Sequence, residues 1–319
     1  MDTEIKIPER KEKQLSEVLI DGKPVSEMNG TEILYWSEKL RNYLENHISD
    51  FEKSPSSLIR QGGISYRVIF DENRRFWDSV RSGSWEPETY LVFDNYLKPD
   101  TYYFDVGAWI GPTVLYASHL SKKVFAYEPD PIAFSELKRN IELNQSNPAI
   151  SKVEIFREAI SVETGNIEMG SKSNGGDSLS SVLLSEEDKS WEVPSISAEK
   201  MLNRADISDE NVFCKVDIEG FEYELIPNFG SILERPKTTL YLSLHPQFLW
   251  NTIKKPSKWN LPGHLNARLR FVNAHRRLLN SLRAFNLYYT NGRPFKPTKE
   301  LLKSLITGSF PNGLVAVKP

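Results

Sequence analysis

The sequence predicts an α/β domain whose mostly parallel sheet is covered by helices on both faces. From Thr101 onward, apolar runs alternate with amphipathic helical segments, which is typical of parallel sheets. The first run ends in a Gly-x-x-x-Gly turn, at Gly107 and Gly111, and the second ends on Glu128, 23 positions after Asp105. A strand, glycine loop, helix, strand and acid at about this spacing place the acid on a ribose.

The expected elements follow in chain order. We expect strands at residues 64–70, 101–106, 123–128, 153–157, 212–217, 239–244, 285–289 and 314–317. We expect helices at residues 88–97, 113–120, 132–143 and 298–305, from apolar residues at helical spacing. In residues 160–169, the tripeptide Thr164-Gly165-Asn166 predicts a hairpin turn.

The domain organisation is predicted from composition. Residues 1–84 are expected to form an accessory segment, whose highly charged first 13 residues are mobile. Residues 85–319 are expected to hold the sheet, with a basic helical insertion at 251–283. The polar stretch 170–195 is longer than an ordinary connection, so a lid or substrate loop is favoured over plain disorder.

The net charge of −3 conceals an asymmetry between the two parts of the chain. Residues 251–319 carry 13 Lys and Arg against one acid, Glu300, whereas the first 250 residues carry 27 bases and 42 acids. This distribution favours an anionic partner near the C-terminal region. The alternative is that these cations only solvate exposed helix faces.

Cysteine content and hydropathy limit the class of protein. The single cysteine, Cys214, permits no disulfide within the chain and no Cys-rich metal site, and its apolar surroundings predict a small buried side chain. The N-terminus has no apolar signal-peptide core, and no stretch approaches the roughly 18 apolar residues of a membrane span. We therefore expect a soluble, cytoplasmic protein; the oligomeric state is left open.

The glycine loop predicts a cofactor smaller than a dinucleotide. Trp109 stands where a dinucleotide loop has its middle glycine, so there is less room for a pyrophosphate, and S-adenosylmethionine fits better. Gly107 and Gly111 would let the backbone approach the ligand and the next helix. Asp105 would meet the ligand's ammonium, directly or through water, and Glu128 would accept both ribose hydroxyls. The alternative for both acids is helix capping or turn formation.

Several segments resemble the FkbM family of S-adenosylmethionine-dependent methyltransferases. They are Asp105-Val106-Gly107-Ala108-x-x-Gly111, Tyr127-Glu128-Pro129-Asp130-Pro131 with Leu137 and Asn140, Glu158-Ala159-Ile160-Ser161, Lys215-Val216-Asp217-Ile218-Glu219-Gly220-Phe221-Glu222 and, upstream, Trp85-Glu86-Pro87-Glu88. The resemblance covers roughly residues 85–245. One departure is Trp109, where the family commonly has asparagine.

The resemblance implies a seven-stranded class I methyltransferase sheet with an antiparallel last strand. It also implies O-methylation of a hydroxyl on a sugar, glycan or related polar metabolite, which the basic C-terminal region would allow to be anionic. The cofactor-binding residues expected from the loop chemistry and the resemblance are Asp105, Gly107, Ala108, Gly111, Glu128, Pro129, Glu158, Ala159 and Glu86.

Three residues are candidates for catalysis, because a hydroxyl acceptor benefits from a base. Asp217, Glu219 and His245 follow the fourth and fifth core strands, at the edge where open α/β sheets bind ligands. His245 is favoured as general base, with a histidine held by a turn carbonyl as the alternative. The two acids would orient substrate or position His245. A Mg²⁺ site is less favoured, because hard cations prefer oxygen ligands, so no metal is expected. Lys215 is expected to point outward.

Other functions stay open at this point. A nucleic-acid methyltransferase would use the basic C-terminal region, although the sequence contains no recognisable RNA-binding module. A nicotinamide-dependent oxidoreductase is weakened by the incomplete glycine loop. A silent module that only binds the cofactor is the last alternative.

Overall fold

The computed structural model describes residues 19–20, 23–24, 56–70, 73–170, 190–254 and 261–319. The chain divides into two compact units, Met1–Pro55 and Ser56–Pro319, so the boundary expected after residue 84 lies inside the second unit. The described strands of the first unit, β1 (Leu19–Ile20) and β2 (Lys23–Pro24), pair antiparallel. The predictions of a mobile first 13 residues and of a lid within residues 171–189 lie outside the described residues.

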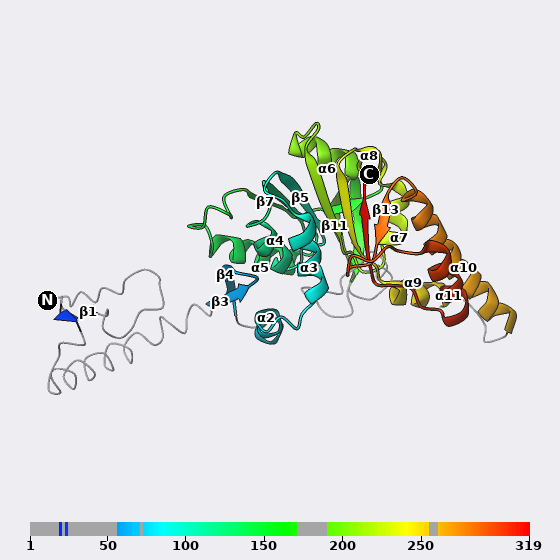
Figure 1. Ribbon diagram of the computed structural model, residues 1–319, viewed down its shortest axis with the longest axis horizontal. Helices are drawn as coiled ribbons and strands as arrows, with labels where there is room; N and C mark the ends of the chain where they lie inside the picture. Colours follow the sequence, from blue (N-terminus) through cyan, green and yellow to red (C-terminus); the bar gives the residue numbers. More distant parts are fainter. Residues whose placement is uncertain (1–18, 21–22, 25–55, 71–72, 171–189, 255–260) are drawn as a thin grey trace. The chain divides into compact units, whose positions relative to one another are not determined.

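The second unit is built on a seven-stranded sheet in the order β13-β14-β12-β11-β5-β6-β7 (Figure 1). Its strands are β5 (Thr101–Val106), β6 (Lys123–Tyr127), β7 (Val153–Phe156), β11 (Asn211–Val216), β12 (Thr238–Ser243), β13 (Asn286–Tyr288) and β14 (Gly313–Val317). Strand β14 is antiparallel to both neighbours, and the other pairs are parallel. The predicted seven-stranded sheet with an antiparallel last strand is confirmed.

Helices cover both faces of this sheet. One core cluster combines strand side chains with α3 (Pro87–Tyr96), α4 (Pro112–Ala117) and α5 (Pro131–Glu142). The other face packs on α6 (Ala198–Ala205), α7 (Glu222–Leu225), the 3₁₀ turn η4 (Ile226–Asn228), α8 (Gly230–Glu234) and α10 (Leu261–Ser281). Adjacent residues of β5, Tyr103 and Phe104, enter opposite clusters, as the two-residue period of a strand requires.

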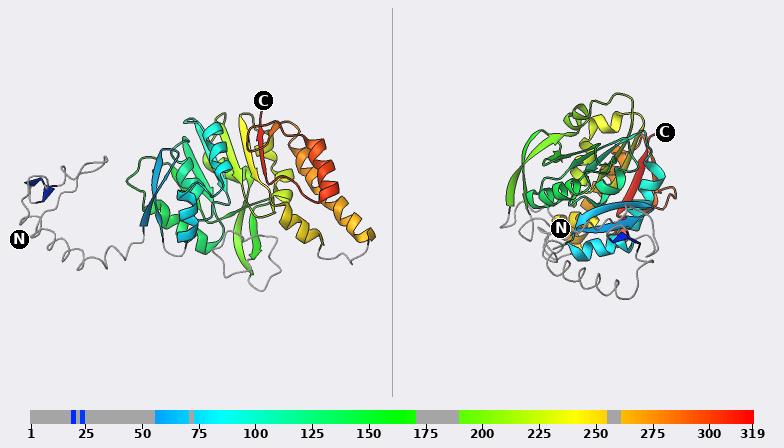
Figure 2. Two further views of the ribbon diagram at one scale, coloured as in Figure 1. Left: turned by 60° about the horizontal axis from the view of Figure 1, so that its bottom comes forward. Right: turned by 90° about the vertical axis from the view of Figure 1, so that its left-hand side faces the viewer.

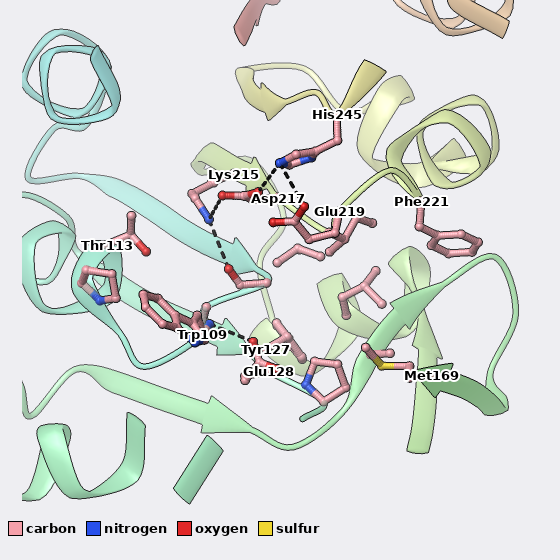
Figure 3. A pocket seen from close by; sticks show the side chains of 18 of the residues that line it. Trp109, Thr113, Tyr127, Glu128, Met169, Lys215, Asp217, Glu219, Phe221 and His245 are labelled. Carbon is pink, nitrogen blue, oxygen red and sulfur yellow. Dashed lines mark hydrogen bonds and ion pairs between the residues drawn. The ribbon is translucent and has the colours of Figure 1, made fainter. Parts of the chain in front are cut away.

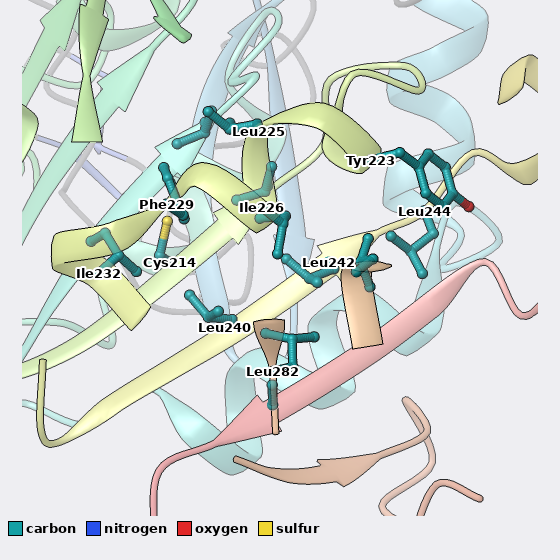
Figure 4. Close-up of a cluster of buried hydrophobic side chains, with 14 of the residues drawn as sticks. Cys214, Tyr223, Leu225, Ile226, Phe229, Ile232, Leu240, Leu242, Leu244 and Leu282 are labelled. Atoms are coloured by element: carbon teal, nitrogen blue, oxygen red, sulfur yellow. The ribbon is translucent and has the colours of Figure 1, made fainter. Parts of the chain in front are cut away.

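Cys214 lies in the second of these cores, as predicted (Figure 4). It is fully buried among aliphatic and aromatic side chains such as Phe229, Ile232 and Leu240. Burial raises the pKa of its thiol well above the ordinary value, so the reactive thiolate is disfavoured. Cys214 is therefore a packing residue.

A smaller sheet corrects the predicted hairpin. Strands β8 (Ala159–Ser161) and β9 (Gly165–Gly170) do not pair with each other, because β10 (Ser190–Ser197) lies between them. It is parallel to β8 and antiparallel to β9. The turn residues at Thr164 suggest that the two strands beside them pair with each other. The strand that pairs with both comes from a later segment, and the residues near the turn do not reveal this.

The remaining elements lie at the two ends of the unit. The hairpin β3 (Ser56–Gln61) and β4 (Ile64–Ile69) precedes α2 (Arg74–Arg81). At the β13 edge, α9 (Pro246–Lys254) packs on α10, and α10 packs on α11 (Pro297–Thr307) (Figure 2). Within the described residues, no helix has the length and apolarity needed to cross a bilayer.

A buried asparagine joins the hairpin, the glycine loop and α5. The Asn140 side chain accepts a hydrogen bond from the Ile69 N–H (2.7 Å) and donates one to the Ile110 carbonyl (2.9 Å). It is completely buried, so both backbone groups would lose their partner if the amide were removed.

We expect Asn140→Ala to lower the free energy of unfolding by about 2–4 kcal/mol, since two buried backbone groups become unsatisfied. Urea denaturation measures the change. The control Asn203→Ala, at an exposed position of α6, should change stability by less than about 0.5 kcal/mol. Equal effects of the two substitutions would contradict the proposed tethering.

Candidate functional site

A cavity opens at the carboxyl ends of the central strands (Figure 3). Its empty volume is about 1080 Å³, including space open to solvent. Ten of the residues singled out from the sequence line it: Glu86, Gly107, Ala108, Glu128, Pro129, Glu158, Ala159, Asp217, Glu219 and His245. The other two candidate site residues, Asp105 and Gly111, are not among the lining residues.

The two loop glycines are required by contacts within the chain. Gly107 has a φ of +85°, and a Cβ there would lie 1.9 Å from the Asp217 carbonyl oxygen. At Gly111, with a φ of +94°, a Cβ would lie 2.6 Å from Leu137 Cδ1. Gly107 thus brings the ends of β5 and β11 together, and Gly111 lets α5 pack on the loop.

Glu128 is nearly buried at the end of β6 and faces the cavity. Its two oxygens accept hydrogen bonds from the backbone N–H groups of Trp109 and Asp130, both at 2.8 Å. Burial raises the pKa of this carboxyl to about 7, although the two hydrogen bonds act in the opposite direction. A carboxylate has about four acceptor positions, so two remain for a ligand.

Lys215 does not point outward as expected. It is opposite Asp105 in the pairing of β11 with β5, and its side chain is only 3% exposed. Its ammonium lies 3.2 Å from Asp105 Oδ1, 3.2 Å from the Gly107 carbonyl and 3.3 Å from Asp217 Oδ2. Burial acts to lower the pKa of Lys215, but the nearby carboxylates outweigh it and raise the value.

Asp105 is therefore engaged inside the protein. Besides Lys215, it accepts hydrogen bonds from the hydroxyls of Tyr103 (2.8 Å) and Thr113 (2.6 Å), and it is fully buried. The protein's own ammonium group occupies the position that the sequence suggested for a ligand's ammonium. The contact of Asp105 with a cofactor stays a prediction. Its hydrogen bonds inside the protein give Asp105 a positioning role.

The three predicted catalytic residues come together at one side of the cavity. His245 Nε2 lies 3.5 Å from Asp217 Oδ1 and 3.5 Å from Glu219 Oε2 (Figure 3). Its Nδ1 lies 3.0 Å from Glu222 Oε1. Glu222 is fully buried and also accepts the N–H groups of Ile218 and Gly220, so it fixes the direction of the imidazole. The sequence reasoning assigned no role to Glu222.

This arrangement holds a proton on His245. Burial acts to lower the pKa of the imidazole, but Glu222, Asp217 and Glu219 together raise it to about 9. Burial also raises the pKa of Glu219 to about 8, against the charge of His245. One oxygen each from Asp217 and Glu222 and one nitrogen of His245 lie within 4.8 Å of one another, so a cation could be held here.

One end of the cavity is lined by Glu158, Pro129, Ala159, Ile160 and Met169. Both oxygens of Glu158 contact the guanidinium of Arg204 from α6. This ion pair holds Glu158 in the cavity wall and balances its negative charge. β9 contributes Met169 to this wall. The sequence reasoning did not single out Arg204 or Met169.

Another wall is aromatic. Phe76 from α2 packs edge-on against Trp109, with ring centroids 4.4 Å apart, and against Trp85, at 5.1 Å. Glu86 follows Trp85 with a φ of +39° and accepts a hydrogen bond from the Thr89 hydroxyl at 2.9 Å. Only the tertiary structure brings α2 to Trp109, the residue that departs from the family pattern.

A family model for the methyltransferase FkbM domain matches residues 105–280, more than half of the chain. The chain belongs to the FkbM methyltransferase family. The resemblance found in the sequence is confirmed. Membership of a methyltransferase family makes the alternative of a nicotinamide-dependent oxidoreductase unfavourable.

Similarity to individual proteins is more limited. The chain is 36% identical over 89 residues to a tRNA (guanine(37)-N(1))-methyltransferase of Leishmania major and 34% identical over 90 residues to that of Leishmania braziliensis. Each match covers 28% of this chain and only 12% of the relative. The chain thus spans only a small part of the length of those relatives.

Two solved structures are also similar. A methyltransferase FkbM from Methylobacillus flagellatus KT aligns over 86% of this chain and 60% of its own, with 13% identity and a TM-score of 0.38. A SAM-dependent O-methyltransferase from Thermotoga maritima aligns over 85% and 80%, with 14% identity and a TM-score of 0.36. The fold assignment rests on the strand order and the family model.

The buried ion pair of Lys215 is expected to be essential for stability. Lys215→Met should lower the free energy of unfolding by about 3–5 kcal/mol, because Asp105 is left charged and buried. Adding Asp105→Asn should recover part of this loss. The control Lys123→Met removes a surface ion pair, Lys123 with Glu154, and should cost at most about 1 kcal/mol. Urea denaturation of wild type and the three variants measures these changes, and equal losses in Lys215→Met and Lys123→Met would contradict the prediction.

We expect the imidazole of His245 to titrate near pH 9 in the ligand-free protein, measured by NMR. Glu222→Gln should lower this midpoint, because it removes the strongest upward influence, whereas Glu224→Gln at an exposed position of the same helix should not. A wild-type midpoint near the ordinary value of about 6.5 would contradict the carboxylate arrangement.

The same pKa shift predicts a pH dependence of stability. Because the folded-state pKa is about 9 and the ordinary value is 6.5, protonated His245 contributes its full stabilisation below about pH 6.5. This contribution is lost as pH rises through about 9. Urea denaturation should therefore show the stability advantage of wild type over His245→Gln shrinking across that range, and a constant difference would contradict it.

Proposed function

We propose that the protein is an S-adenosylmethionine-dependent O-methyltransferase acting on a hydroxyl of a sugar, glycan or related polar metabolite. The observation that carries this proposal is the cluster of Asp217, Glu219 and His245 beside the cavity. Methylation of a hydroxyl releases a proton, and this cluster supplies proton-accepting groups where the acceptor oxygen would lie.

Several features of the cavity lining support S-adenosylmethionine as the cofactor. S-adenosylmethionine would supply a methyl group already activated by its sulfonium, so that alignment of the acceptor oxygen does most of the remaining work. The two acceptor positions left on Glu128 suit the two ribose hydroxyls. Pro129, Ala159, Ile160 and Met169 offer an apolar wall suited to a purine ring.

Lys215 positions catalytic groups and does not bind the ligand. Its ammonium donates hydrogen bonds to Asp105 and Gly107 and forms an ion pair with Asp217, so it is engaged within the protein. The fixed charge holds Asp217 in place beside His245. Asp217 and Glu86 are then the carboxylates at hand for the ligand's own ammonium.

Proton transfer in this proposal involves the whole cluster. At neutral pH, His245 carries its proton, since its pKa is about 9, and an imidazolium cannot accept another. Glu219 is also largely protonated at that pH, since its pKa is about 8. The acceptor's proton therefore passes to Asp217, and His245 and Glu219 serve as bases only at higher pH. Glu222 fixes the imidazole through its contact with Nδ1.

The charge of the cavity bears on the acceptor. The lining contains Glu86, Glu128, Glu158, Asp217 and Glu219 against the cations Lys215 and His245. Above about pH 8, where Glu128 and Glu219 are ionised, such a wall repels a phosphate or sulfate close to the reacting hydroxyl. We therefore propose that the acceptor is neutral or cationic at its reacting end, in place of the anionic acceptor considered from the overall charge pattern.

A second candidate function is methylation of RNA. It is favoured by the similarity of part of the chain to two enzymes named as tRNA (guanine(37)-N(1))-methyltransferases. The acidic lining opposes an RNA backbone inside the cavity, although a single base could enter. Methyl transfer to a tRNA transcript, with none to hydroxyl acceptors, would replace the first proposal by this one.

The first test is titration calorimetry with S-adenosylhomocysteine. We expect wild type to bind it, and to bind more weakly below about pH 7, because protonated Glu128 accepts fewer hydrogen bonds. Glu128→Gln should lower the affinity at least about tenfold at pH 8 and remove this pH dependence. Glu234→Gln, at an exposed position of α8, is the matched control.

Absence of binding by wild type would overturn the cofactor assignment. Given binding, the methyl group of labelled S-adenosylmethionine is followed onto sugars, glycans, nucleosides and tRNA. In the presence of an accepted hydroxyl, Asp217→Asn should lower kcat without loss of S-adenosylhomocysteine affinity beyond about tenfold. Unchanged kcat in Asp217→Asn, Glu219→Gln and His245→Gln would contradict the role of the cluster.

A further inference from the structure

The C-terminal helical region presents a cationic surface with no exposed acid among residues 265–319, whose side chains are described. Eight basic residues are exposed there: Arg270, Arg276, Arg277, Arg283, Arg293, Lys296, Lys299 and Lys303. Within the described part of the chain, the side chain of none of them makes an ion pair or hydrogen bond. The only acid of the region, Glu300, is buried and accepts the Tyr289 hydroxyl at 2.6 Å.

The same surface exposes large aliphatic side chains. Leu265 and Leu269 of α10 are 59% and 47% exposed, and Leu302 and Ile306 of α11 are 58% and 78% exposed. Each pair is four residues apart, so each lies on one face of its helix. These four are the majority of the large exposed hydrophobic residues in the described chain.

The two aliphatic pairs belong to one surface. Helices α10 and α11 lie side by side at the β13 edge (Figures 1 and 2). Arg268, between Leu265 and Leu269, donates hydrogen bonds to the carbonyls of Leu305 (3.4 Å) and Ile306 (2.8 Å). The turn of α10 that carries the leucines therefore adjoins the last turn of α11. We call this surface, with its flanking cations, the α10–α11 face.

We propose that the α10–α11 face binds an anionic lipid bilayer. Aliphatic side chains gain free energy by entering the boundary between headgroups and acyl chains, and flanking Lys and Arg pair with lipid phosphates. A basic helix face with exposed apolar residues is typical of membrane-surface binding. This contact is peripheral and is independent of the function proposed for the cavity.

Nucleic acid is the less suitable partner for this face. Polyanion binding would use the eight cations, but single-stranded nucleic acid is held by aromatic side chains on which bases stack. The large exposed apolar side chains of the α10–α11 face are aliphatic. Exposing these aliphatic side chains to water is unfavourable in free energy. Contact with a phosphate backbone would leave them exposed, whereas a bilayer would bury them.

The test is co-sedimentation of the full chain with vesicles of phosphatidylcholine alone and of phosphatidylcholine mixed with phosphatidylglycerol. We expect binding to the mixed vesicles only, weakened by salt. Lys299→Gln with Lys303→Gln should reduce the partition coefficient about 30-fold. Leu302→Gln with Ile306→Gln should reduce it at least about tenfold. An unchanged thermal midpoint shows that each variant is folded.

Two matched controls separate the face from general charge and hydrophobicity. Lys98→Gln with Lys200→Gln removes two exposed charges elsewhere, and Leu91→Gln removes an exposed leucine of α3; both should leave binding unchanged. Equal binding to both kinds of vesicle, no binding, or equal loss in controls and variants would overturn the proposal. So would tight binding to a tRNA transcript that the aliphatic substitutions leave intact, in the absence of vesicle binding.

Discussion

The arrangement around the cavity depends on one buried lysine in the middle of the sheet. A lysine on a central strand would be costly without partners, and Lys215 has three acceptors, on β5, on the glycine loop and at the end of β11. The pairing register of β11 with β5 brings Lys215 opposite Asp105. The same charge therefore fixes the sheet register, the start of the loop and the carboxylate that faces His245.

A second consequence of the fold is the separation of charge. The acids gather around the cavity, where Glu86, Glu128, Asp217 and Glu219 line the walls. Within the described part of the chain, eight exposed bases without an ion pair lie on α10, on α11 and between them, at the β13 edge of the sheet. Two regions of opposite sign thus exist in a chain of near-neutral total charge. We infer that they have different tasks, one toward the cofactor and acceptor and the other toward an anionic surface.

The cluster of Asp217, Glu219 and His245 shows how burial and charge act together. Desolvation alone would leave His245 neutral and ready to accept a proton. Three carboxylates around one imidazole reverse that outcome and keep it protonated near neutral pH. The role expected for a histidine at a strand end is therefore changed by its neighbours, above all by Glu222, whose own position is fixed by two backbone N–H groups.

The amino-acid sequence alone was sufficient to predict the sheet and the family, and ten of its twelve candidate site residues line the cavity. Apolar runs and glycine positions are local signals, so strands such as Thr101–Val106 were predicted with the bounds observed. Tertiary structure decided the rest, because contacts between distant segments leave no local pattern. Tertiary contacts direct Lys215 toward Asp105 and place β10 between β8 and β9. They also bring three pairs of distant residues together: Phe76 with Trp109, Glu222 with His245, and Arg204 with Glu158.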